Sequence, residues 1–149
     1  NNSRKTLKVR LETSPFTLSI DQPVINADGL VGIVIREYAP YADIRIITDP
    51  GSGVDLVVER TRDSASLQCK REMDHICQAM RLKWNAQIQP GDIVLSSGLD
   101  TRYPEGYRVG RITHVLPQAG QLHRTANITP SVDFDRQEEV LILSKRSIP

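Results

Sequence analysis

The stretch GDIVLSSGLDTRYPEGYRVGRITHV, residues 91–115, contains four of the nine glycines in this 149-residue chain. A histidine, His114, closes the stretch, and its other notable residues are Gly91, Gly98, Gly106, Gly110, Ser96 and Ser97. Glycines gather in loops that bind phosphate and in the turns that carry a serine nucleophile, but they also gather in ordinary β-turns. The surrounding sequence decides between these three possibilities.

Alternation of apolar and polar residues dominates the rest of the chain and predicts strands. Residues 7–11, 16–21 and 54–58 alternate residue by residue, which is typical of strands with one buried face. More continuously apolar, β-branched runs predict further strands at 30–35, 44–47, 92–95 and 140–143. Residues 79–85 favour a strand over a helix, and 70–78 is expected to be a loop or one helical turn. The chain is therefore predicted to be all-β.

Turn residues and a weak internal repeat predict two similar units. Turns are expected at Gly29, Gly91, Gly98, Pro104 and Gly106, whereas Gly110 lies inside a returning strand. Residues 23–35 and 92–112 each contain an apolar strand, a glycine turn, and Val-Gly before a second apolar strand. We expect two small tandem β-barrels of the six-stranded type, packed together, at residues 1–62 and 63–149. The strand at 140–144 is a candidate to pack with the first barrel.

Composition excludes several classes of protein. The chain has 19 basic and 18 acidic residues, a net charge of +1 and 5% aromatic residues, so it lacks the basic stripe of a nucleic-acid binder. Its longest apolar run that includes glycine, residues 29–35, is far too short to span a bilayer. Residues 1–9 are polar and basic, and no signal peptide is visible in them. The sequence alone leaves open a cytosolic protein or a segment separated from its targeting region.

Two cysteines, Cys69 and Cys77, flank His75 and raise the question of a metal site. Seven intervening residues match no common zinc spacing, and a fourth ligand is missing, so we expect neither a metal nor a cofactor. A local disulfide and two unrelated thiols both remain open.

The tests for chemistry in the opening stretch give no catalytic residue. A phosphate-binding loop requires Gly-Lys-Ser/Thr between a strand and a helix, and no lysine follows Gly98 or Gly110. A chymotrypsin-like double-barrel serine hydrolase is the main alternative, because paired β-barrels can carry a Ser-His-Asp triad. Ser96 and Ser97 have neither the G-x-S-x-G nor the Gly-Asp-Ser-Gly setting of a nucleophile, although His114 lies nearby in the sequence. We therefore interpret both serines as turn residues.

The polar segment 99–108 is the remaining candidate for function. It carries Arg102, Tyr103 and Tyr107, and these residue types are enriched at protein interfaces. The three residues are candidate partner-binding residues. In the alternative interpretation the segment is a solvated hairpin loop whose tyrosines cover the end of the barrel. Tyr38 and Tyr41 allow the same two interpretations.

Residues 91–115 resemble the most recognisable segment of the rod shape-determining protein MreC family. In that family a Gly-Asp, an apolar strand, a Ser-Gly, a Tyr/Phe-Pro-x-Gly and a Val-Gly-x-Val/Ile follow one another. Residues 23–34, 44–50 and 129–143 are similar to further parts of the family pattern. The chain departs from the pattern at Asp21-Gln22, where the family usually has a longer glycine-rich insert.

The resemblance implies two small β-barrels and a non-enzymatic role as a cell-shape scaffold of the bacterial cell-wall elongation machinery. Such a scaffold binds peptidoglycan-synthesis proteins and self-associates. The implied partners are penicillin-binding protein 2, RodA, MreD and MreB. The resemblance also implies a periplasmic location and an inner-membrane anchor formed by a helix upstream of this segment.

Overall fold

A computed structural model describes residues 6–11, 20–70, 77–99, 102–117, 120, 122–136 and 139–143. All regular secondary structure in these ranges is β-strand, which confirms the predicted all-β class. No helix in the same ranges has the length and apolar character of a membrane span.

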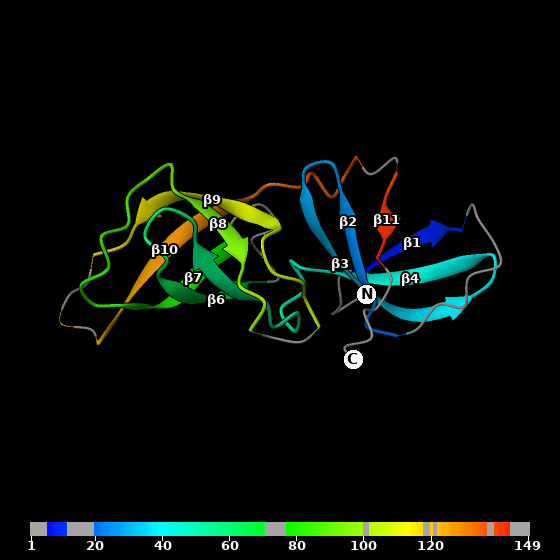
Figure 1. Cartoon of the computed structure of the whole chain (residues 1–149), viewed down its shortest axis with the longest axis horizontal. Coiled ribbons are helices and arrows are strands. Elements are labelled where there is room, and N and C mark those ends of the chain that lie inside the picture. The colour runs from blue at the N-terminus through cyan, green and yellow to red at the C-terminus, as the bar shows by residue number, and fades with distance from the viewer. Residues whose placement is uncertain are drawn as a thin grey trace.

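The strands form two sheets, one open and one closed into a barrel (Figure 1). The N-terminal sheet has the order β1-β4-β3-β2-β11 and the closed barrel the order β10-β7-β6-β5-β8-β9. All pairs are antiparallel. The strands are β1 (Thr6–Arg10), β2 (Pro23–Asn26), β3 (Gly29–Tyr38), β4 (Tyr41–Ile46), β5 (Asp55–Val58), β6 (Ser64–Cys69), β7 (Cys77–Lys83), β8 (Ile93–Ser96), β9 (Arg108–Val115), β10 (His123–Pro130) and β11 (Leu141–Ile142).

The chain passes from the sheet to the barrel earlier than the boundary at residue 62 expected from the sequence. β5 pairs with β6 on one side and with β8 on the other, so it belongs to the closed barrel. The change of sheet therefore falls between Ile46 and Asp55. The alternating pattern of residues 54–58 shows that a strand forms there, but it does not show which strand becomes its neighbour. At the other end, β11 returns to pair with β2 in the N-terminal sheet.

Two strands of the barrel have no counterpart among the predicted strands. β6 and β10 alternate through small residues, Ala65 and Ala126, whose apolar signal is weak although both side chains are buried. The strand expected at 79–85 is β7, which already begins at Cys77. Residues 16–19 of the strand expected at 16–21, and residues 71–76 of the expected loop, lie outside the described residues.

β3 joins the two units because both of its faces are buried. Val31 and Val34 belong to the core of the N-terminal sheet. Leu30 and Ile33, on the same strand, belong to the core of the closed barrel, together with Leu56, Leu82 and Ile128. The uninterrupted apolar run at 30–35 is explained by this double burial. The two units therefore pack together around shared apolar contacts.

The β2–β3 turn lies directly against β9 of the barrel. A Cβ atom at Gly29 would stand 2.3 Å from the backbone oxygen of Arg108, which is closer than any side chain tolerates. The backbone φ of Gly29 is 149°, a conformation that glycine adopts far more readily than other residues. Glycine at this position lets the two units touch through their backbones.

Candidate partner-binding surfaces

The segment 99–108 folds back onto the barrel instead of presenting all of its candidate residues. Tyr103 is 2% exposed, and its hydroxyl donates a hydrogen bond of 2.7 Å to the backbone oxygen of Ser52 in the connection between the units. Tyr107 is half-buried against the barrel core. The guanidinium carbon of Arg102, also half-buried, lies 5.6 Å from the centre of the Tyr103 ring. The structure thus brings Arg102 and Tyr103 together, and partner binding by this segment stays a prediction.

Ser96 holds the base of the same segment. Its side chain is fully buried, and its hydroxyl donates to the backbone oxygen of Pro104 at 2.5 Å. The backbone N–H of Tyr107 donates back to the Ser96 Oγ at 3.0 Å. His114 is exposed on β9, where its Nδ1 lies 3.3 Å from the Thr113 hydroxyl. The Ser96 hydroxyl is therefore engaged with the backbone of the segment, and neither of these partners is a histidine.

The glycines of residues 91–115 have structural roles in and around this segment. Gly91, Gly98 and Gly106 have φ values of 97°, 79° and 92°. Gly110 lies inside β9, where a Cβ atom would stand 2.5 Å from the backbone oxygen of Thr129 on β10. The first three glycines allow turns with positive φ, and Gly110 allows β9 and β10 to approach closely.

Asp92, in the Gly-Asp that opens the stretch 91–115, forms the best-defined ion pair of the barrel. Arg60 donates from Nε to Oδ1 at 2.8 Å and from Nη2 to Oδ2 at 3.0 Å. The backbone N–H of Gln89 donates to the same carboxylate at 2.9 Å. The hydrogen bond from Arg60 is the largest cause of a lowered pKa for Asp92, against a smaller opposing effect of burial. This pair fixes the turn before β8 to the turn after β5.

Cys69 and Cys77 form a disulfide between β6 and β7, where the two residues face each other in the strand register. Both side chains are 1% exposed. The thiols are consumed in this bond, which decides between the two alternatives that the sequence left open. His75 lies outside the described residues.

A cluster of tyrosines and cations lies on the outer face of the N-terminal sheet; we call Lys8, Arg36, Tyr38, Tyr41 and Asp43 the tyrosine cluster. The Lys8 Nζ is 4.6 Å from the centre of the Tyr41 ring, and the Arg36 guanidinium carbon is 5.2 Å from that of Tyr38. The Tyr38 hydroxyl donates to Asp43 at 3.0 Å, and Arg36 pairs with the same carboxylate at 3.2 Å. Tyr38 is 37% exposed. Tyrosine and arginine side chains are enriched at protein interfaces.

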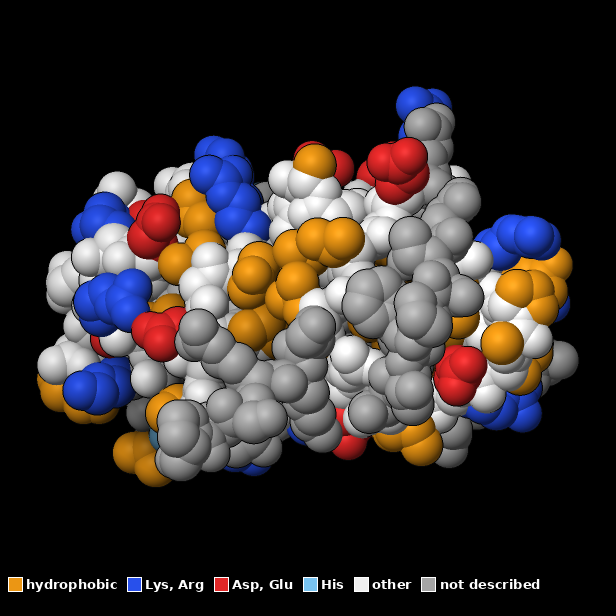
Figure 2. Space-filling view, turned by 45° about the vertical axis from the view of Figure 1, so that its right-hand side comes forward, with side chains coloured by type: hydrophobic (Ala, Val, Ile, Leu, Met, Phe, Trp, Pro, Cys, Tyr) orange, Lys and Arg blue, Asp and Glu red, His pale blue; other side chains and the backbone are white. Residues whose placement is uncertain are grey.

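The charges on the face shown in Figure 2 are mixed. Lysine and arginine side chains lie at both ends of the molecule with acidic side chains scattered among them, and apolar side chains gather near the middle and at the right-hand end. This arrangement fits recognition by local contacts better than attraction to a large polyanion.

The comparison with known families gives one match over most of the chain. The family model described as rod shape-determining protein MreC, barrel core, matches residues 15–144. The chain is 27% identical to the cell shape-determining protein MreC of Escherichia coli strain K12 over 122 residues, which covers 82% of this chain and 33% of that protein. It is 25% identical to the protein of the same name from Listeria monocytogenes over 128 residues, 84% of this chain and 43% of that protein. The chain thus spans less than half the length of these curated relatives.

Solved structures agree with this match. The crystal structure of MreC from Pseudomonas aeruginosa superposes with a TM-score of 0.81 at 25% identity, and the alignment covers 94% of this chain and 99% of that one. A complex between penicillin-binding protein 2 and MreC from Helicobacter pylori contains a chain of the same fold, with a TM-score of 0.65 and 14% identity over 88% of this chain and 79% of that one.

Proposed function

The chain belongs to the MreC family of rod shape-determining proteins, and on that premise we propose that it acts as a non-catalytic scaffold of the cell-wall elongation machinery. The observation that carries the proposal is the family match over residues 15–144, which includes every strand from β2 to β11. The engagement of Ser96 with its own loop supports a role without a serine nucleophile. The scaffold binds partner proteins and copies of itself.

Penicillin-binding protein 2 is the partner that we propose first. A solved complex joins that protein to MreC of Helicobacter pylori, whose fold this chain shares. RodA, MreD and MreB follow as partners from the family alone. We also propose that the barrels lie in the periplasm and that a helix on their N-terminal side anchors them in the inner membrane. A periplasmic domain of MreC with the same fold supports that location.

We assign the first partner contact to the tyrosine cluster. The rings of Tyr38 and Tyr41 are partly accessible at the surface, whereas the side chain of Tyr103 is buried. A tyrosine already oriented by neighbouring cations loses little conformational freedom when it binds. Arg102 and Tyr107 remain as a second assignment, because neither is exposed to the extent that Tyr38 is.

Biolayer interferometry with the immobilised ectodomain of penicillin-binding protein 2 from the same bacterium tests this proposal. Wild-type chain is expected to bind, and Tyr38→Ala/Tyr41→Ala is expected to weaken binding by roughly tenfold or more, the effect of losing a hot-spot pair. Lys83→Ala, an exposed residue on β7 of the barrel, is the matched control and is expected to bind as wild type does. If the folded wild-type chain shows no binding at a concentration of tens of micromolar, roughly the Kd of a weak complex, the proposed partner is wrong.

The proposed absence of catalysis has its own test. A fluorophosphonate probe is expected to leave Ser96 and Ser97 unmodified, because the Ser96 hydroxyl is buried and donates to a backbone oxygen. Labelling of either serine that His114→Ala abolishes would support the hydrolase alternative.

Self-association is proposed to use the edge of the N-terminal sheet. Within the described ranges β1 pairs only with β4, and an edge strand offers unpaired backbone groups to a second chain. Size-exclusion chromatography with light scattering is expected to show a concentration-dependent increase in mass. A single monomer peak at the highest attainable concentration, with no cross-linked species, speaks against it.

A further inference from the structure

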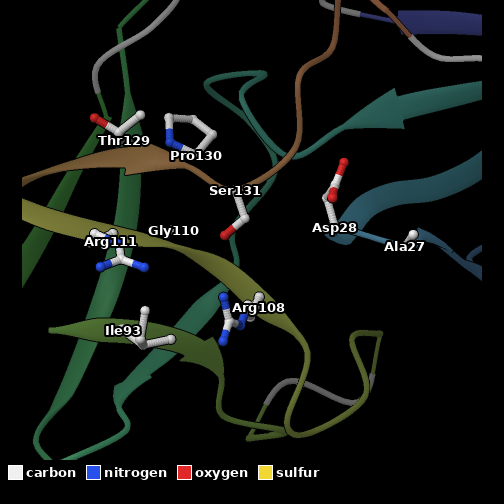
Figure 3. A pocket seen from close by; sticks show the side chains of 9 residues that line it. All are labelled: Ala27, Asp28, Ile93, Arg108, Gly110, Arg111, Thr129, Pro130 and Ser131. Carbon is white, nitrogen blue, oxygen red and sulfur yellow. The ribbon is translucent and has the colours of Figure 1, made fainter. Parts of the chain in front are cut away.

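The two units enclose a cleft at their junction, separate from the tyrosine cluster. Its volume is about 370 Å³, a size within the usual range of ligand sites. One wall is the β2–β3 turn, with Asp28. The other is the outer surface of β8, β9 and β10, with Ile93, Arg108, Arg111 and Thr129 (Figure 3).

A bulge in β9 brings the two arginines to the same face of the barrel. In a regular strand, residues three apart point to opposite faces. Here Val94 pairs with Gly110 and Leu95 pairs with Arg108, so Val109 is an extra residue between them. Val109 and Gly110 are both buried, and Arg108 and Arg111 on either side are both exposed. Bulges of this kind redirect side chains and are frequent beside functional sites.

The strand register places an apolar floor and a hydroxyl beside the arginines. Ile93 on β8 pairs with Arg111, and Thr129 on β10 pairs with Arg111 from the other side. Directly paired residues share a face of the sheet, so these three side chains form one row across the outside of the barrel. In Figure 3 Arg111 lies above Ile93 and Arg108 to its right, and Asp28 lies across the gap.

The charges of the cleft are not balanced. Among the described residues, Arg36, Arg60 and Arg136 each pair with an aspartate. Arg108 and Arg111 make no hydrogen bond or ion pair through their guanidinium groups in the part of the chain that the structure describes, and Asp28 is the single acidic residue of the lining. A guanidinium group presents parallel N–H donors that match the two oxygens of a carboxylate. The cleft therefore offers two carboxylate positions beside an apolar contact.

We propose that this cleft binds an acidic peptide segment of a partner protein in which two carboxylates flank an apolar side chain. The carboxylates pair with Arg108 and Arg111, and the apolar side chain covers Ile93. Because β8, β9 and β10 each have a neighbour on both sides, the segment is recognised by its side chains and does not add a strand. The inference rests on the proposed scaffold function, since it describes how one of its protein contacts is made.

An NMR titration with the peptide acetyl-Glu-Leu-Glu-amide tests the assignment. Low-millimolar peptide is expected to shift the backbone amide signals of residues 93, 108–111 and 129 in a saturable way. Arg108→Glu/Arg111→Glu is expected to raise the Kd by roughly tenfold or more. Both arginines are exposed, so this variant is expected to fold.

Two controls accompany the titration. Lys83→Glu makes the same change of charge per residue outside the cleft and is expected to leave the Kd unchanged. Acetyl-Lys-Leu-Lys-amide is expected to cause no saturable shift.

Three results would overturn the assignment: no saturable shift in folded wild type, an equal Kd in the double arginine variant, or equal shifts with inorganic phosphate at the same concentration. The last would identify a general anion site. Binding of the ectodomain of penicillin-binding protein 2 is measured on the same samples. If that binding persists while the peptide fails, the cleft assignment is wrong and the scaffold proposal stands. If the ectodomain fails to bind while the peptide binds as expected, the partner is wrong and the cleft is retained.

Discussion

At the scale of single residues, the Gly-Asp pair of the opening stretch has a structural purpose. The Asp92 side chain in the ion pair is 5% exposed and accepts hydrogen bonds from Arg60 and from the backbone of Gln89. Charge-assisted hydrogen bonds to a buried carboxylate are stronger than those between neutral groups. Asp92 thus stabilises the entry to β8, at the start of the segment that carries the family pattern.

The stability of the chain is expected to depend on acid through Asp92. Its pKa is lowered in the folded state, chiefly by Arg60, so the contribution is complete above the ordinary pKa of about 4. It is lost as the pH falls through the lower, folded-state value. Asp92→Asn is expected to lose about 1–3 kcal/mol at neutral pH, the usual cost for hydrogen bonds to a charged group. Thermal melts from pH 7 to pH 3 should show a smaller decrease in Tm for Asp92→Asn than for wild type.

Asp28→Asn changes an exposed aspartate and serves as the control for the acid dependence. Its melting curves are expected to follow those of wild type at each pH. Equal acid dependence in wild type and Asp92→Asn would show that the Arg60–Asp92 pair contributes nothing in this range.

At the scale of elements, strands with bulky β-branched residues were predictable and strands with small residues were not. The runs at 30–35 and 44–47 became β3 and β4 because their side chains fill the core. β6 and β10 owe their burial to neighbours that no local pattern reveals.

The candidate site could be predicted only in part, for the same reason. Sequence reasoning found Tyr103, but its burial follows from a contact with Ser52, 51 positions away. Arg108 and Arg111 passed unnoticed, since the bulge that aligns them appears only in the strand register.

The disulfide is expected to stabilise the β6–β7 pair. It closes a loop with a sequence separation of 8, for which the loss of unfolded-state entropy corresponds to about 2–3 kcal/mol. Cys69→Ala/Cys77→Ala is therefore expected to lower the free energy of unfolding by about that amount, measured by urea denaturation. Wild type treated with reductant should behave like the double variant, and reductant should leave the double variant unchanged. A wild-type midpoint that stays constant after both thiols are shown to be free contradicts this expectation.

At the scale of the whole molecule, the two units share apolar core contacts. The barrel core includes Leu30 and Ile33 from β3 of the N-terminal sheet, so that core is incomplete without the sheet. We expect a single unfolding transition. Methyl NMR signals of Ile44, in the sheet core, and Ile128, in the barrel core, should disappear at the same urea concentration. Loss of the Ile44 signal at a clearly lower concentration would show that the units unfold separately.

Gly29 is expected to control the contact between the units. In Gly29→Ala the added methyl group meets the backbone oxygen of Arg108, and the turn must move away from β9. Gly106→Ala is the matched control, because its φ of 92° is also positive but no atom lies within 4 Å of the added carbon. The control is expected to cost about 1–2 kcal/mol from backbone strain alone. Gly29→Ala should cost more, and hydrogen exchange should increase in β9. If Gly29→Ala and Gly106→Ala lose the same free energy of unfolding, the contact between Gly29 and Arg108 does not control the junction.

In the order of the described strands the chain crosses between the units twice, once between β4 and β5 and once between β10 and β11. A pulling force that acts between the sheet and the barrel is thus divided between two backbone connections in parallel. The first is fastened at Ser52 by Tyr103, and the second is fastened by a hydrogen bond of 3.0 Å from the Ser131 N–H to the Val109 oxygen. A force applied to one unit therefore reaches the other through both backbone connections at once.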